Sequence, residues 1–158
     1  MIHLIKILCP TDYSSTSDNA VRYAVDFSRK VGAHVRFLHI PTPGAAPEKY
    51  EFSSADALGS PARMDEKSDL APHNFSELLT AEQKSGLNAD FRVINGDAAT
   101  VIAEQALTWG ADLIIMGFHG RTGRERLMMG SVSEEVFRSS DVPVLLVKKQ
   151  AADKIFVE

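Results

Sequence analysis

Residues 111–120, with the sequence ADLIIMGFHG, decide the fold class of this chain. Residues 113–116 are all apolar, which is typical of a parallel strand that helices cover on both faces. The glycines that follow, Gly117 and Gly120, end this run and open a loop. The stretch therefore predicts a buried strand over residues 112–116, with a loop at its carboxyl end.

Outward from this strand, short apolar runs alternate with segments of helical periodicity. We expect strands over residues 4–9, 35–40, 91–94, 112–116 and 143–147, and helices over residues 14–31, 75–85, 99–108 and 132–139. In the third helix, Val101, Ile102, Ala106 and Leu107 are expected to face the core. The alternation predicts an α/β fold, a single-domain open five-stranded parallel sheet with helices on both faces. We expect the sheet to be Rossmann-like, with the strand order 3-2-1-4-5.

Residues 1–150 are expected to form this one domain. Within it, residues 41–74 are rich in Pro, Ala, Ser and Glu and show no firm period, which indicates a variable loop. Residues 151–158 are interpreted as a C-terminal tail, although residues 154–157 could pair as an edge strand.

The composition of the chain limits the kinds of binding partner and the cellular compartment that we expect. The chain has 158 residues and a net charge of −4, which disfavours nucleic acids and anionic membranes as partners. No apolar stretch approaches the roughly 20 residues that span a bilayer. The single cysteine, Cys9, excludes an intramolecular disulfide and is expected to be a buried, unreactive thiol. We expect a cytoplasmic protein.

Two loops follow strands one and four, where ligands bind in open parallel sheets. The first is residues 10–12, and the second runs from Gly117 to Ser133. Glycines allow backbone N–H groups to approach a phosphate, and residues 130–133 would form an anion-binding helix N-terminus. Alternatively, Ser131 and Glu134 form a capping box that satisfies this helix end without a ligand. Neither a G-x-x-x-x-G-K-[ST] loop nor a G-x-G-x-x-G motif after the first strand occurs.

The second loop fits the pattern G-x2-G-x9-G-[S/T] at Gly117, Gly120, Gly130 and Ser131. This pattern resembles the ATP-binding signature of universal stress proteins. Matching segments extend the resemblance over nearly the whole chain, with the exception of residues 41–74. These segments are residues 10–12, 38–40, 96–97, 113–117, 130–133 and 143–147.

The resemblance implies ATP as the ligand, with Mg²⁺ carried on the phosphates. The implied site residues are Pro10, Thr11, Asp12, Ile40, Gly117, His119, Gly120, Gly130, Ser131, Val132 and Ser133. The resemblance assigns Asp12 and the backbone of Ile40 to the adenosine moiety, in a pocket shaped by Pro10. It assigns the residues from Gly117 onward to the ribose and phosphates. From its chemistry alone, Asp12 could instead form a helix cap or an Asx turn, and His119 could be an exposed loop histidine.

These features lead to three functional hypotheses. The first is an ATP-responsive stress or signalling module that binds ATP or a related adenine nucleotide, and forms a homodimer through its apolar fifth strand. The second is a slow ATP hydrolase or nucleotidyl transferase, for which Asp12, His119 and Asp97 are the candidate catalytic groups. The third is a protein-interaction module without nucleotide. We expect a binding protein rather than an enzyme, with no metal site built by the protein itself.

Overall fold

The structure, a computed structural model, describes residues 5–41, 72–118 and 131–148. Five strands form one parallel sheet in the order β3-β2-β1-β4-β5, which confirms the predicted topology. The strands are β1 (Lys6–Pro10), β2 (His34–His39), β3 (Ala89–Val93), β4 (Leu113–Gly117) and β5 (Val144–Val147). The helices are α1 (Ser15–Val31), α2 (Pro72–Lys84), α3 (Ala98–Trp109) and α4 (Ser131–Ser139).

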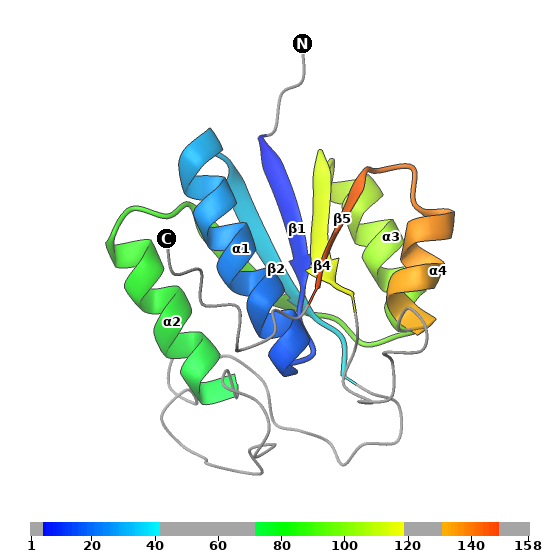
Figure 1. Cartoon of the computed structure of the whole chain (residues 1–158), viewed down its shortest axis with the longest axis horizontal. Helices are drawn as coiled ribbons and strands as arrows, with labels where there is room; N and C mark the ends of the chain where they lie inside the picture. Colours follow the sequence, from blue (N-terminus) through cyan, green and yellow to red (C-terminus); the bar gives the residue numbers. More distant parts are fainter. Residues whose placement is uncertain (1–4, 42–71, 119–130, 149–158) are drawn as a thin grey trace, which may run out of the picture.

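The sheet separates two hydrophobic layers, with α1 and α2 on one face and α3 and α4 on the other (Figure 1). Alternate strand residues point to opposite faces, so Ile115 packs with α1 and α2 while Ile114 packs with α3 and α4. Cys9 is completely buried on the α1 and α2 face, as predicted, and burial raises the pKa of its thiol well above the usual range.

The helix ends follow the expected cap chemistry. Ser14 caps α1 by accepting a hydrogen bond of 3.2 Å from the Ser17 backbone N–H, and Gly32 ends the helix in the left-handed region. Asp97 and Gly110 play the same two roles for α3. Among the described residues, no helix is long and apolar enough to cross a membrane.

The structure corrects several expectations at element boundaries. β1 runs on to Pro10, and α2 begins at Pro72 rather than at residue 75, because proline fits the first turn of a helix. Leu107 is 69% exposed and does not face the core. The buried residues of α3 are Ala99, Val101, Ile102 and Ala106, and Leu107 lies outside their stripe. Residues 42–71 and the expected tail and edge strand beyond residue 148 lie outside the described residues.

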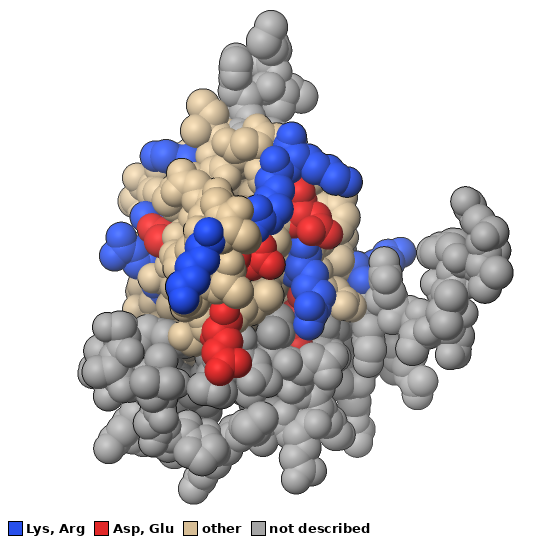
Figure 2. All heavy atoms as spheres, turned by 90° about the vertical axis from the view of Figure 1, so that its left-hand side faces the viewer, with Lys and Arg blue, Asp and Glu red and all other residues tan. Residues whose placement is uncertain are grey.

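The outer surface of the α1 and α2 layer carries charges of both signs (Figure 2). Arg29 of α1 forms an ion pair with Glu82 of α2 and donates a hydrogen bond of 3.3 Å to the Ser85 carbonyl. These contacts hold the C-terminal ends of the two helices together.

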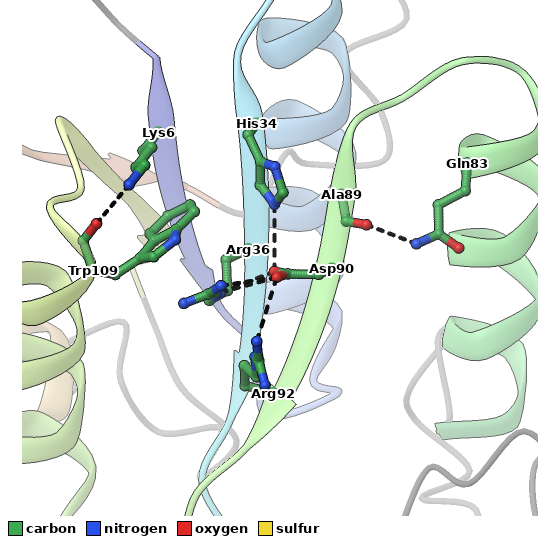
Figure 3. Close-up of polar contacts among 8 residues, drawn as sticks. All are labelled: Lys6, His34, Arg36, Gln83, Ala89, Asp90, Arg92 and Trp109. Atoms are coloured by element: carbon green, nitrogen blue, oxygen red, sulfur yellow. Dashed lines mark hydrogen bonds and ion pairs between the residues drawn. The ribbon is translucent and has the colours of Figure 1, made fainter.

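A charged cluster covers β2 and β3 on the other face of the sheet (Figure 3). The Arg36 guanidinium donates two hydrogen bonds of 2.9 Å to Asp90, and its central carbon lies 4.3 Å from the centroid of the Trp109 ring. His34 and Arg92 approach the same carboxylate at 3.6 and 4.0 Å. Burial tends to raise the pKa of Asp90, but the hydrogen bonds and charge of Arg36, aided by His34, lower it overall.

Candidate functional site

The carboxyl ends of β1 and β4 lie side by side at the point where the strand order reverses. The chain leaves β1 through α1 toward β2, and it leaves β4 through α4 toward β5. Figure 1 shows these two strand ends at the same end of the sheet, and their last residues are Pro10 and Gly117. This edge is where an open α/β sheet binds its ligand.

The turn after β1 is tied to the end of β2 through Thr11. The Thr11 backbone N–H donates a hydrogen bond of 2.8 Å to the Leu38 carbonyl. The Thr11 carbonyl oxygen lies 2.9 Å from Nδ1 of His39, whose ring is buried. Both backbone groups of Thr11 are thus held by β2.

Asp12 forms an Asx turn at the entrance to α1. Its Oδ1 accepts a hydrogen bond of 2.9 Å from the Ser14 N–H and a further one from the Ser17 hydroxyl. The Asp12 N–H donates to the same hydroxyl at 3.1 Å. The Asx turn predicted as an alternative role for Asp12 is therefore present, and it involves Oδ1, one of the two carboxylate oxygens. The side chain is half-buried at the carboxyl edge of the sheet.

Tyr13 occupies an unusual backbone conformation beside Asp12. Its φ of 62° lies in the left-handed region, which residues other than glycine rarely adopt. The ring is buried, 4.5 Å from the His39 ring and 6.0 Å from the Phe75 ring, centroid to centroid. Packing against these two rings holds the unfavourable backbone in place.

Ile40 follows directly after β2 and is half-buried against the core cluster that contains Leu8 and Leu38. The His39 carbonyl accepts a hydrogen bond of 3.0 Å from the N–H of Ile94, the residue that follows β3. This bond ties the end of β2 to the end of β3. Pro10, Thr11, Asp12 and Ile40 therefore form one connected group at the ends of β1 and β2.

The first turn of α4 lies against the end of β4. The buried hydroxyl of Ser133 donates a hydrogen bond of 2.9 Å to the Phe118 carbonyl, one residue after Gly117. Val132 is 37% exposed. Gly117, Val132 and Ser133 thus form the second described part of the site.

The capping-box alternative for α4 stays a prediction, because the Ser131 side chain and the residues before it lie outside the described part of the chain. Ser131 is the first residue of α4. The Glu134 carboxylate forms an ion pair with Arg138 at 2.7 Å.

The remaining predicted site residues lie outside the described part of the chain. His119, Gly120 and Gly130 belong to residues 119–130. Ser131 is described through its place in α4 but not through its side chain.

The candidate catalytic group Asp97 has a structural role. Its Oδ2 accepts hydrogen bonds from the backbone N–H and the hydroxyl of Thr100, at 3.1 and 2.8 Å, which lowers its pKa. Among the described residues, no group of three or more His, Cys, Asp or Glu side chains could hold a metal ion.

Sequence reasoning missed His39, Tyr13 and Ser17 as parts of this site. Serines at positions 14 and 17, at the start of an apolar helical run, are typical of a helix N-cap, but this pattern does not reveal the bond from Ser17 back to Asp12. His39 ends an apolar strand and Tyr13 carries no turn signature. Their roles depend on contacts between β1, β2 and α2 that no local pattern encodes.

Comparison with known proteins identifies the family of the chain and agrees with its fold. The model of the universal stress protein family matches residues 5–148. A universal stress protein of Methanocaldococcus jannaschii is 31% identical over 148 residues, which cover 91% of this chain and 82% of that protein. A universal stress protein solved in complex with cAMP has a TM-score of 0.63 at 20% identity, covering 92% of this chain and 98% of its own. The universal stress protein from Archaeoglobus fulgidus in complex with dAMP has a TM-score of 0.60 at 18% identity, covering 94% of this chain and 100% of its own. These two structures share the fold.

Proposed function

The chain belongs to the universal stress protein family, and on that premise we propose that it is a nucleotide-responsive stress or signalling module that binds ATP. One observation carries the proposal. The described residues of the implied site gather at the carboxyl ends of β1, β2 and β4, at the switch point of the sheet. Adenine nucleotides bound to two members of the same fold support the class of ligand.

The described residues suit the adenosine half of the ligand. Ile40 offers a half-buried apolar side chain beside the turn 10–12, and Asp12 offers a carboxylate for ribose hydroxyls or an amine. Pro10 and Thr11, which precede Asp12, are buried. A site with apolar walls and a few polar groups is typical of cofactor binding.

The phosphates are assigned to the other part of the site. Gly117 ends β4, and Ser131, Val132 and Ser133 form the first turn of α4, where the helix dipole and backbone N–H groups favour an anion. His119, Gly120 and Gly130 complete this part of the proposal from the sequence pattern alone. Mg²⁺ is proposed to be carried on the phosphates, because it keeps several waters and needs few protein ligands.

We favour binding over turnover. Of the candidate general bases, Asp97 accepts both its hydrogen bonds from Thr100 at the N-terminus of α3, and Asp12 Oδ1 accepts two from the turn that follows it. The hydrogen bonds from Thr100 lower the pKa of Asp97, which makes it a weaker base. We propose that other components sense whether the protein has nucleotide bound.

Calorimetric titration with Mg·ATP tests the proposal, with AMP as the comparison ligand. The Gly130→Asp variant adds a side chain and a negative charge where the phosphates are assigned, so it should lose ATP binding and affect AMP less. Ser139→Asp adds the same charge at the other end of α4 and is the matched control. If wild type binds neither nucleotide, the protein-interaction alternative replaces this proposal.

We further propose a homodimer through β5. This strand is an edge of the sheet, and all four of its residues, Val144–Val147, are only half-buried. A second copy paired along this edge would cover these apolar side chains and extend the sheet across the two copies. Sedimentation that shows a monomer at micromolar concentration would contradict the dimer.

The proposed setting is the cytoplasm, without nucleic acid or membrane as a partner. Net charge is −4, and on the described part of the α1 and α2 face cations and anions are interspersed (Figure 2). Such a face offers no continuous basic surface to a polyanion.

A further inference from the structure

The buried imidazole of His39 contacts both neighbours of Asp12 in the chain, Thr11 through a hydrogen bond and Tyr13 through its ring. Its Nδ1 lies 2.9 Å from the Thr11 carbonyl oxygen, and because a carbonyl only accepts, Nδ1 must carry the hydrogen. Its ring centroid lies 4.5 Å from that of Tyr13. The imidazole is 3% exposed, so protein atoms hold it in this orientation.

These two contacts fix Thr11 and Tyr13, the residues on either side of Asp12, and the backbone of these residues determines the direction of the Asp12 side chain. Thr11 is bonded to β2 through its N–H as well, at 2.8 Å from the Leu38 carbonyl. Tyr13 has a φ of 62°, a conformation that a residue with a side chain leaves unless packing retains it. The ring of His39 supplies part of that packing, together with the ring of Phe75.

We infer that His39 is a positioning residue of the nucleotide site. It fixes Thr11 and Tyr13, so that the Asp12 carboxylate is presented at the carboxyl edge of the sheet beside Ile40, the residue that follows His39. Without the Nδ1 donor the Thr11 carbonyl is released, Tyr13 relaxes toward negative φ, and Asp12 turns with it. This inference rests on the proposed function, because it assigns His39 to the same site.

Three variants separate positioning from stability. His39→Leu keeps the apolar volume and removes the donor, whereas His39→Asn keeps a side-chain N–H close to the position of Nδ1. Val35→Ala removes buried volume from the same strand and the same face, four residues away and about 13 Å along the strand. It is the control for lost stability alone.

Calorimetry with Mg·ATP, at a temperature where every variant is folded, gives the first readout. We expect the Kd of His39→Leu to rise about tenfold, the size of effect that one lost hydrogen bond has in a binding site. His39→Asn should stay within about threefold of wild type and Val35→Ala should bind as wild type does. Equal affinity of His39→Leu and wild type overturns the inference and leaves the proposed function intact. Wild type that binds no adenine nucleotide overturns both.

Ring-nitrogen NMR shifts of His39 give a second readout that does not depend on His39→Leu folding. We expect the wild-type ring to carry its hydrogen on Nδ1. In His39→Leu, where that variant is folded, the Asp12 and Tyr13 amide signals should also move, and they should move far less in Val35→Ala. A wild-type imidazole with its hydrogen only on Nε2 overturns the inference, since Nδ1 could not then donate to Thr11.

Discussion

The hydroxyl of Ser133 donates a hydrogen bond of 2.9 Å to the backbone carbonyl of Phe118. These residues lie fifteen positions apart in the chain, one in the first turn of α4 and the other directly after β4. The bond therefore joins the two ends of the glycine-rich segment to which the phosphates are assigned. The Ser133 side chain is buried, so water replaces the bond poorly when it is lost.

Replacement of Ser133 by alanine should loosen this junction. We expect Ser133→Ala to lower the free energy of unfolding by about 1 kcal/mol and to weaken ATP binding several-fold. Urea unfolding and calorimetry measure the two effects. Ser139→Ala is the matched control, because the Ser139 hydroxyl bonds to a carbonyl of its own helix at an exposed site. Equal ATP affinity in Ser133→Ala and Ser139→Ala would show that the junction does not serve the site.

Alanine at Gly96 should be far more costly than alanine at Gly86. Both glycines have positive φ, 146° and 101°, but a Cβ at Gly96 would lie 2.7 Å from Val101 Cγ2, whereas a Cβ at Gly86 meets nothing within 4 Å. We expect Gly86→Ala to cost about 1 kcal/mol of stability and Gly96→Ala at least about 2 kcal/mol.

The double variant Gly96→Ala/Val101→Ala tests the clash directly. If contact with Val101 causes the additional cost, the double variant should be more stable than the sum of the two single changes predicts. Strict additivity would mean that the backbone conformation alone accounts for the loss.

The fold was predictable from sequence because its determinants are local. The apolar run at residues 113–116, the serine at position 14 and the glycines at positions 32 and 110 each act through neighbours in the chain. Leu107 marks the limit of such reasoning. Leu107 is apolar and adjacent to the buried Ala106, yet it points to solvent. Only the packing of α3 on the sheet determines which of these two residues is buried.

The candidate site was predictable to a smaller extent. The positions of residues 10–12 and Gly117 follow from topology, since parallel strands end at a common edge. The hydrogen bond between His39 and Thr11 joins residues that are 28 positions apart in the sequence. The left-handed backbone of Tyr13 depends on packing against the rings of His39 in β2 and Phe75 in α2. Neither contact leaves a periodic or compositional trace, so neither could be derived from the chain alone.

Cys9 should report on opening of the sheet. It is the single cysteine of the chain and is completely buried in β1, and burial raises the pKa of its thiol. We expect it to resist a thiol reagent at pH 8 in the native protein and to react fully in denaturant, because the reactive species is the thiolate. Added Mg·ATP should slow labelling further if the nucleotide stabilises the folded state. Rapid labelling of native protein would contradict the described burial.

The charged cluster around Asp90 should make stability depend on pH in the acid range. The pKa of Asp90 is lowered in the folded state, so its ionised form stabilises the fold. That contribution is complete above the ordinary pKa of 3.8 and is lost as the pH falls through the folded value. The free energy of unfolding should therefore decrease on acidification below about pH 5.

Asp90→Asn should be less stable than wild type at pH 7, and the difference should shrink as the pH approaches 3, because the wild-type carboxylate then gains its proton. Urea unfolding followed by the fluorescence of Trp109 is a suitable measurement, since this single tryptophan lies 4.3 Å from the Arg36 guanidinium. The exposed Asp26 on α1 provides the control variant Asp26→Asn, which should show no such convergence. A stability difference between Asp90→Asn and wild type that stays constant from pH 7 to pH 3 would mean that the Asp90 charge does not support the fold.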